Sequence, residues 1–303
     1  MPRPPDKGPI SMLYCSDDPN VREQWLTVGS AARVTGHTER APLQTRLLGA
    51  TLQLWLDDAG QPQCRLGSVP MLVTQHCGYL WVTTGNAPAR PLFALPEFDQ
   101  PGRRIVDCGG IGVATSGLRV VENFLDMGHF PYVHGGTLGQ LPHTTVAPYT
   151  VHVDAATDEL WATGCRFFQP QASASAGAGI DAQYRYRVMH PLCAALYKSC
   201  PNRPGEHDVI GLFIQPLDHE HVVAHCLLVV FEDQLGDAEM IRFQHMIFGQ
   251  DKPILESQRP RRLPLDPASE AQMRCDLSAV AYRRWLRARG MRFGVQHVDS
   301  AGS

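Results

Sequence analysis

Alternation of apolar and polar residues is the clearest pattern in the first third of the chain. In the segment 44–64, Leu52, Leu54 and Leu56 form an alternating run, and the letters DDAGQ that follow are typical of a hairpin turn. The segment GYLWVTTG (78–85) has the composition of another short strand that ends in a turn. The pattern therefore predicts a small antiparallel β unit.

An irregular stretch follows this β unit. The segment 86–104 contains four prolines and no regular pattern, so it predicts a covering loop or linker. Such segments commonly mark the boundary between domains. We therefore expect a small all-β domain over residues 1–95 and a second domain over residues 96–303.

Helical spacing first appears in the segment 118–130. Val121, Phe124 and Leu125 belong to an apolar series at this spacing, and Pro131 is expected to end the helix. Two residues that are three apart on such a helix project from the same face.

Long apolar runs and a final helical region complete the second domain. The segments 181–191 and 207–233 read as long strands with turn residues between them, and the chain reads as helical from about 237 onward. The first dozen residues predict a loose arm, and QASASAGAG (171–179) predicts a surface loop or edge. The predicted fold class is α+β: an antiparallel sheet flanked by helices, preceded by the all-β unit.

Composition and charge exclude several classes of protein. Of 303 residues, 44% are hydrophobic and 19% are charged, which is typical of a globular protein. The formal net charge is −3, and the basic segments 259–262 and 282–290 are expected to form a solvated face. We therefore expect no nucleic-acid partner.

Membrane and disulfide signals are equally weak. No apolar run approaches the ~20 residues that a membrane helix needs, and the N-terminus has no signal-peptide pattern, so we expect a cytoplasmic protein without membrane contact. The nine cysteines are irregularly spaced and include no Cys-x-x-Cys pair. Neither a disulfide framework nor a cysteine zinc site is expected.

The segment ENFLDMGHFPYVH (122–134) carries the candidate chemistry. Asp126 and His129 are three apart on the predicted helix, and His134 follows just beyond it. Two imidazoles placed in this way, together with a carboxylate from elsewhere, would form a two-histidine, one-carboxylate site with open positions for Fe(II) chemistry. By spacing alone, the histidines could equally be a helix-terminal imidazole stabilised by the helix dipole and a loop residue.

The longer string VVENFLDMGHFPYVHGGTLG closely resembles the mononuclear-iron motif of Rieske non-haem iron oxygenases. The matching positions are Glu122, Asn123, Asp126, His129 and His134. The resemblance implies that the two histidines are iron ligands. It also implies that Asp126 bridges towards the electron-donating cluster and that Asn123 neighbours the iron, both as further residues of the catalytic site.

The third ligand of that family is an aspartate near the C-terminus, at the start of a helix. FGQDKPILESQRP (248–260) resembles this segment, which implies Asp251 as the third iron ligand. Asp251 is also a candidate helix N-cap, because Pro253 would stand in the first helical turn. The two roles are compatible with one another.

The family normally carries a Rieske [2Fe–2S] cluster held by Cys-x-His and Cys-x-x-His in an N-terminal β domain. This chain contains neither motif, although its N-terminal strands resemble that scaffold. The segment 62–77 is a short bridge in place of the cluster-binding loops, and we expect Cys64, His76 and Cys77 to be structural residues. The resemblance therefore implies mononuclear Fe(II), no [2Fe–2S] cluster in this chain, and electrons from NADH through a separate Rieske-bearing reductase.

One group within the family fits both the retained iron motif and the missing cluster: the bacterial methylxanthine N7-demethylase subunits. This implies O₂-dependent oxidative N-demethylation of a small heteroaromatic substrate, 7-methylxanthine, to xanthine and formaldehyde. We expect substrate contacts from the sheet and the 140–200 region, and a homo- or hetero-oligomer. The alternatives are a non-catalytic structural partner of an intact oxygenase, an oxygenase or O-demethylase for another aromatic ring, and a zinc hydrolase. Retention of every iron-site residue favours an enzyme.

Overall fold

The N-terminal part of the chain forms two small antiparallel sheets. The computed structural model describes residues 14–171, 179–200, 203–232 and 234–296, so the predicted arm and most of the predicted loop at 171–179 lie outside the described residues. One sheet has the order β1-β7-β6 and the other β2-β3-β4-β5. Their strands are β1 (Leu26–Ser30), β2 (Leu43–Leu47), β3 (Ala50–Leu56), β4 (Pro62–Leu66), β5 (Val69–Met71), β6 (Val73–His76) and β7 (Tyr79–Val82).

The predicted hairpin is confirmed. Strands β3 and β4 pair antiparallel, with Leu56 opposite Pro62. Between them the Asp57 carboxylate accepts hydrogen bonds from the backbone N–H groups of Ala59 and Gln61, at 3.0 and 2.8 Å. An aspartate that bonds to the backbone ahead of it closes a tight turn, which is why this polar segment reverses the chain.

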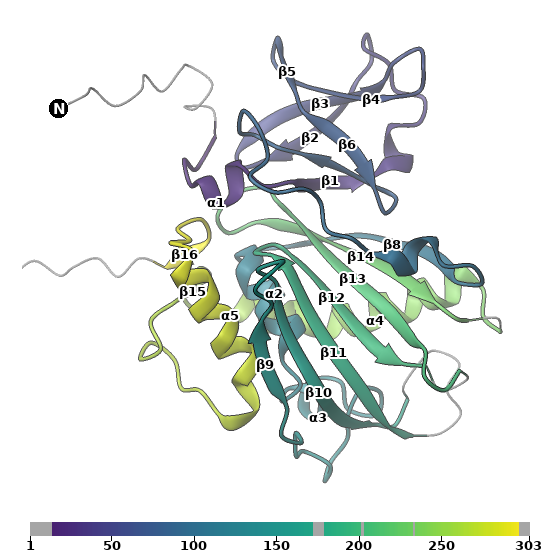
Figure 1. Ribbon diagram of the computed structural model, residues 1–303, viewed down its shortest axis with the longest axis vertical. Helices are drawn as coiled ribbons and strands as arrows, with labels where there is room; N and C mark the ends of the chain where they lie inside the picture. The colour runs from purple at the N-terminus through teal and green to yellow at the C-terminus, as the bar shows by residue number, and fades with distance from the viewer. Residues whose placement is uncertain (1–13, 172–178, 201–202, 233, 297–303) are drawn as a thin grey trace, which may run out of the picture.

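A seven-stranded antiparallel sheet forms the larger part of the molecule (Figure 1). Its order is β8-β14-β13-β12-β11-β10-β9. The predicted α+β class is confirmed, with the small β unit stacked on this sheet. The strands are β8 (Arg104–Val113), β9 (Thr150–Val153), β10 (Leu160–Gln169), β11 (Ile180–His190), β12 (Cys193–Ser199), β13 (His207–Pro216) and β14 (Val222–Val230).

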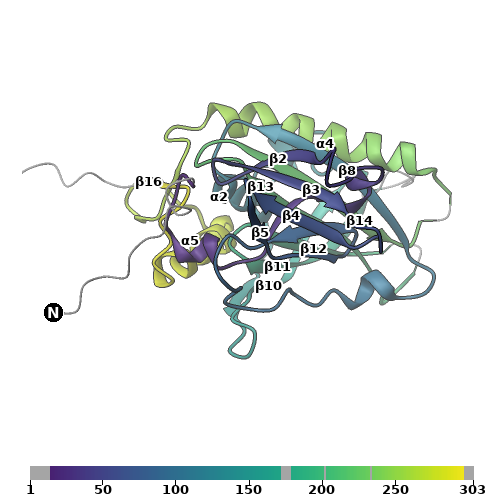
Figure 2. The same ribbon diagram turned by 90° about the horizontal axis from the view of Figure 1, so that it is seen from above.

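Helices lie beside the large sheet, and the longest runs along it (Figure 2). None of the helices in the described part of the chain is long and apolar enough to cross a membrane. The remaining elements are α1 (Pro19–Arg22), η2 (Ala31–Val34), η3 (Pro96–Asp99), α2 (Gly117–Leu125), α3 (Phe130–Val133), α4 (Asp237–Ser257), β15 (Leu263–Pro264), η4 (Arg274–Asp276), α5 (Leu277–Ala288) and β16 (Val295–Gln296).

Two predicted helix boundaries are wrong. Helix α2 ends at Leu125, because Asp126 takes an extended backbone and its Oδ1 accepts a hydrogen bond of 2.6 Å from the Gly128 N–H. Pro131 does not end a helix but stands in the first turn of α3, where its fixed φ is favourable. Asp126 and His129 are therefore not on one helix.

The predicted helix start at Asp251 is also wrong. Helix α4 is continuous from Asp237 to Ser257 and contains Pro253 in its interior. A proline there removes one helical hydrogen bond. Met240 and Leu255, which lie on either side of Pro253 in the helix, are buried, and their packing compensates for the lost hydrogen bond. The segment from 266 to 273, predicted to be helical, is irregular.

Aromatic packing joins the small β unit to the outer face of the large sheet. Tyr79 and Trp81 on β7 each place their rings 5.2 Å from that of Phe213 on β13, edge to face. Phe93, from the loop that follows β7, lies 5.5 Å from Trp81. This cluster covers one face of the large sheet and leaves the other face to the helices.

His225 lies in this interface and provides a test of it. The side chain is 2% exposed, faces the Tyr79 ring at 5.7 Å and hydrogen-bonds Gln215 at 3.2 Å. Burial lowers the pKa of His225 to about 4. In the unfolded chain a histidine has a pKa of about 6.5.

Stability should therefore be complete above pH 6.5 and fall as the pH drops towards 4, since only the unfolded chain takes up this proton. By itself, His225 should lower the free energy of unfolding by about 3 kcal/mol at the acid end of this pH range. Urea unfolding of His225→Gln across this range should show a shallower decline than the wild type, whereas His152→Gln, at an exposed position, should retain the wild-type decline. An unchanged slope in His225→Gln would contradict the assignment.

Candidate metal centre

The three predicted ligands lie together, and the two ends of α3 present the histidines. His129 precedes the first residue of α3 and His134 follows its last. Their Nε2 atoms are 3.2 Å apart. Asp251, from α4, places Oδ1 3.1 Å from Nε2 of His134 and 3.4 Å from Nε2 of His129.

This triangle fits one metal ion. Nitrogen and oxygen ligands about 2.1 Å from a metal and about 95–110° apart stand about 3.1–3.4 Å from one another. Oδ1 of Asp251 is buried and accepts no hydrogen bond of good geometry, which leaves its lone pairs directed at the space between the three groups. Within the described ranges, these three side chains are the one group of three or more histidine, cysteine or carboxylate residues close enough to share an ion.

Hydrogen bonds fix both imidazole rings. Nδ1 of His129 donates to the Asp126 carboxylate at 2.9 Å, and Nδ1 of His134 donates to the side-chain oxygen of Gln250 at 2.8 Å. Because both acceptors are oxygens, each Nδ1 carries a proton and each Nε2 offers its lone pair to the centre. Such outer partners orient ligands and raise their basicity.

Gln250 was missed by sequence reasoning. Its only signal was its position immediately before Asp251, and on a helix two consecutive residues point about 100° apart. Nothing in the sequence showed that both would face His134.

The electrostatics of the site favour a cation. Burial alone would lower the pKa of His129, but the neighbouring carboxylates of Asp126 and Asp251 outweigh burial and raise the pKa to about 9. Burial would raise the pKa of Asp251, yet the two histidines lower it to about 2. A positive charge among the three groups is therefore stabilised, and a metal ion can take the place of the proton.

Asp126 and Asn123 lie on different sides of the centre. The Asp126 side chain is 28% exposed, whereas that of His134 is 1% exposed. Asp126 thus connects the surface to His129 through one hydrogen bond. Asn123, from the last turn of α2, lines a pocket that opens onto the three candidate ligands.

This pocket is a partly enclosed cavity of about 160 Å³ with a mostly apolar wall. Apolar cavities of about 150 Å³ accept a benzene-sized ring. The strands of the large sheet supply part of the wall, as expected, but α4 supplies another part that the sequence did not indicate. The wall includes Tyr184, Tyr186, Phe243, Gln244, Ile247 and Phe248.

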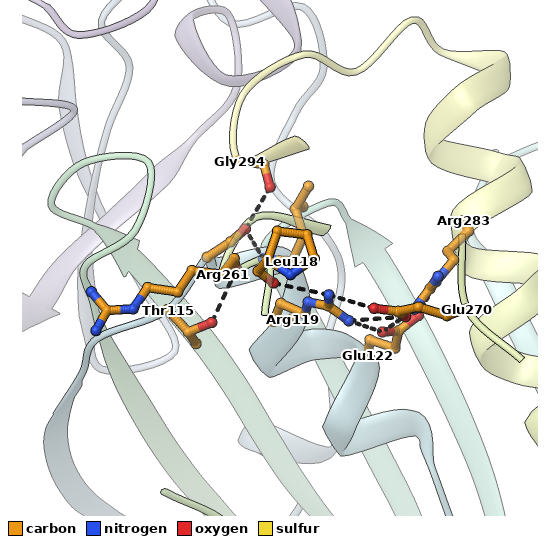
Figure 3. A network of polar contacts seen from close by, with 10 residues as sticks. Thr115, Leu118, Arg119, Glu122, Arg261, Glu270, Arg283 and Gly294 are labelled. Carbon is orange, nitrogen blue, oxygen red and sulfur yellow. Dashed lines mark hydrogen bonds and ion pairs between the residues drawn. The ribbon is translucent and has the colours of Figure 1, made fainter. Parts of the chain in front are cut away.

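A buried ion-pair network holds α2, the helix that precedes the metal site (Figure 3). Arg283 from α5 binds Glu122 at 2.8 Å, and Arg119 binds Glu270 at 2.7 Å and the Pro260 carbonyl at 3.0 Å. The prediction that 282–290 is a solvated face is therefore wrong at Arg283, which is 6% exposed. No local signal showed this, because its partner Glu122 lies 161 residues away along the chain.

Removal of Arg283 should destabilise the fold. Arg283→Met leaves the Glu122 carboxylate buried with only Arg119 nearby, at 3.7 Å, which should cost about 3 kcal/mol in the free energy of unfolding. Arg284→Met changes the neighbouring, exposed arginine and should cost less than about 0.5 kcal/mol. Urea denaturation measures both, and equal losses would show that the network contributes nothing specific.

Comparison with known proteins identifies the family of this chain. Residues 113–291 match the family model described as vanillate O-demethylase oxygenase C-terminal domain. A protein of Pseudomonas sp. (strain TJI-51), described as probable methylxanthine N7-demethylase NdmC, is 42% identical over 276 residues, which cover 91% of this chain and 96% of that protein.

Solved structures share the fold. NdmA of Pseudomonas putida CBB5 with caffeine has a TM-score of 0.72 at 18% identity, covering 88% of this chain and 90% of that one. Dicamba monooxygenase bound to dicamba has a TM-score of 0.70 at 16% identity, and the match covers 89% of this chain and 97% of that one.

The chain therefore belongs to the Rieske-type non-haem iron oxygenases of the vanillate O-demethylase kind, and it is an oxidative demethylase. Within that family it is a relative of the methylxanthine N-demethylases. The resemblance inferred from the sequence is confirmed, and the family implies a mononuclear iron.

Proposed function

We propose that this chain is the iron-bearing subunit of a system that removes the N7 methyl group of 7-methylxanthine. His129, His134 and Asp251 would hold Fe(II), with Asp126 and Asn123 beside it. The observation that carries the proposal is the convergence of two Nε2 atoms and one buried carboxylate oxygen within 3.4 Å of one another. The substrate assignment draws on the 42% identity to the relative described as a probable methylxanthine N7-demethylase.

The net reaction consumes O₂, two electrons and two protons. When bound, Fe(II) supplies the site of O₂ reduction and of hydroxylation at the methyl carbon. The resulting N-hydroxymethyl group loses formaldehyde and leaves N–H on the ring, while the second oxygen atom leaves as water. The apolar pocket would hold the flat ring next to the iron and keep bulk water away from the reacting carbon.

The electrons would come from outside the chain. The sequence lacks both Rieske ligand motifs, and the segment 62–77 forms only β4, β5 and β6 with their turns. Cys64 and Cys77 are buried thiols, and burial raises the pKa of each to about 12, which opposes metal binding as thiolate. We therefore propose a Rieske-like domain over 1–95 that holds no cluster, and an iron domain over 96–303.

A separate Rieske-bearing reductase that oxidises NADH would then be the partner, and it would dock near Asp126. The Asp126–His129 hydrogen bond would carry the electron from this partly exposed position to the iron. We further propose a cytoplasmic homo- or hetero-oligomer.

Formaldehyde release tests the function directly. The iron-loaded chain should release formaldehyde from 7-methylxanthine only when NADH, O₂ and a Rieske-bearing reductase are all present. The control replaces that reductase with a plain flavin reductase and should give no product. Turnover with the plain reductase would contradict the external-cluster proposal, and no turnover with the Rieske-bearing reductase would contradict the demethylase proposal.

Asp126→Asn separates electron transfer from iron binding. The variant keeps an oxygen that can accept from Nδ1 of His129 but loses the negative charge, so iron content should be retained while turnover falls at least about 100-fold. His129→Ala, the matched control, should lose iron itself. The role assigned to Asp126 would be wrong if Asp126→Asn lost iron as His129→Ala does, or if it kept wild-type turnover.

A further inference from the structure

Two opposite charges stand next to each other in the wall of the iron-site pocket. Lys198 on β12 is directly opposite Asp208 on β13. Both side chains line the pocket, and Lys198 is only 8% exposed. Cross-strand neighbours have Cβ atoms about 5 Å apart, so both side chains belong to the same part of the pocket wall. The pocket-lining neighbours of Lys198 along the chain are Leu196 on β12 and Cys200 just after it.

The fold holds this pair in place against its desolvation cost. The backbone N–H of Phe231 donates to Oδ1 of Asp208 at 2.8 Å. Burial lowers the pKa of Lys198 to about 7 and raises the pKa of Asp208. Apolar residues of similar size would stabilise a purely structural wall at least as well as two buried ionisable side chains. The charges are therefore better explained by a ligand than by packing.

The pair faces the same cavity as the candidate iron ligands. On the other side of Lys198, Tyr184 of β11 is its cross-strand partner. The Tyr184 ring lies 6.5 Å from that of Phe130, which in turn lies 5.0 Å from the His129 ring. A row of aromatic rings thus leads across the pocket from the charged pair to the metal centre, as a flat heteroaromatic ligand requires.

We propose that Lys198 and Asp208 bind the lactam edge of the substrate, on the side of the ring remote from the methyl group that is removed. The inference rests on the proposed function. Xanthines carry a ring N–H next to a carbonyl, so the Lys198 amino group donates to the carbonyl oxygen and the Asp208 carboxyl group accepts from the ring N–H. Together the two hydrogen bonds recognise one donor and one acceptor on neighbouring ring atoms. Asp208 thereby excludes rings whose nitrogen at that edge is methylated.

The test compares two substrates that differ at this edge. With the iron-loaded chain and a Rieske-bearing reductase, kcat/KM is measured for 7-methylxanthine and for 1,3,7-trimethylxanthine, which has no ring N–H. The wild type should prefer 7-methylxanthine, and Asp208→Asn should reduce this preference about 10- to 100-fold. Lys198→Met should raise KM for both substrates, since both keep the carbonyl. Arg185→Met, an exposed cation on the neighbouring strand, should behave like the wild type.

A double variant covers the case in which a single variant does not fold. Lys198→Met/Asp208→Leu removes both charges, leaves neither buried alone, and should also lose the preference. The role of the pair would be overturned if the folded variants kept the wild-type preference for 7-methylxanthine, or if the wild type itself showed no such preference. Either result would leave the demethylase proposal intact. Equilibrium dialysis of 7-methylxanthine without reductase distinguishes failure of the demethylase proposal from failure of the Lys198–Asp208 proposal. If the wild type neither binds nor demethylates this ring, both proposals fail.

Discussion

The buried Asp251 carboxylate, placed between two imidazoles, is the constraint around which the rest of the structure is arranged. A carboxylate with an unsatisfied oxygen in such a position is costly unless a cation stands beside it. The two histidines reach it only because a single helical turn, α3, separates them. The hydrogen bonds that the two imidazoles donate to Asp126 and Gln250 fix which ring nitrogen faces the centre. The site is therefore preorganised for a positive ion.

The elements around the candidate metal centre position its ligands and the pocket beside it. The Arg283–Glu122 pair ties α2 to α5, and α2 ends directly before Asp126. Helix α4 carries Asp251 and also forms part of the pocket wall, so one helix positions both this candidate ligand and that wall. The aromatic interface with the small β unit supports the large sheet from its other face. In the proposed function, electrons arrive on the exposed side of Asp126 and the substrate lies in the pocket.

Local signals in the sequence were sufficient for several of the strands and for the identity of the family. Alternation predicted β3 and β4, and the motif around His129 and His134 indicated the class of iron site. Helix ends were predicted less well, because Pro131 is as favourable in a first turn as after a last one. Gln250 and the buried Arg283 could not be predicted, since their partners are more than 100 residues away along the chain. Such contacts depend on tertiary packing rather than on local pattern.

Metal and sulfide analysis of the intact chain, purified without air, tests the central claim most directly. The account predicts near-stoichiometric iron, no acid-labile sulfide, and loss of the iron in Asp251→Ala. Zinc in place of iron, labile sulfide in the wild type, or full iron content in Asp251→Ala would contradict it.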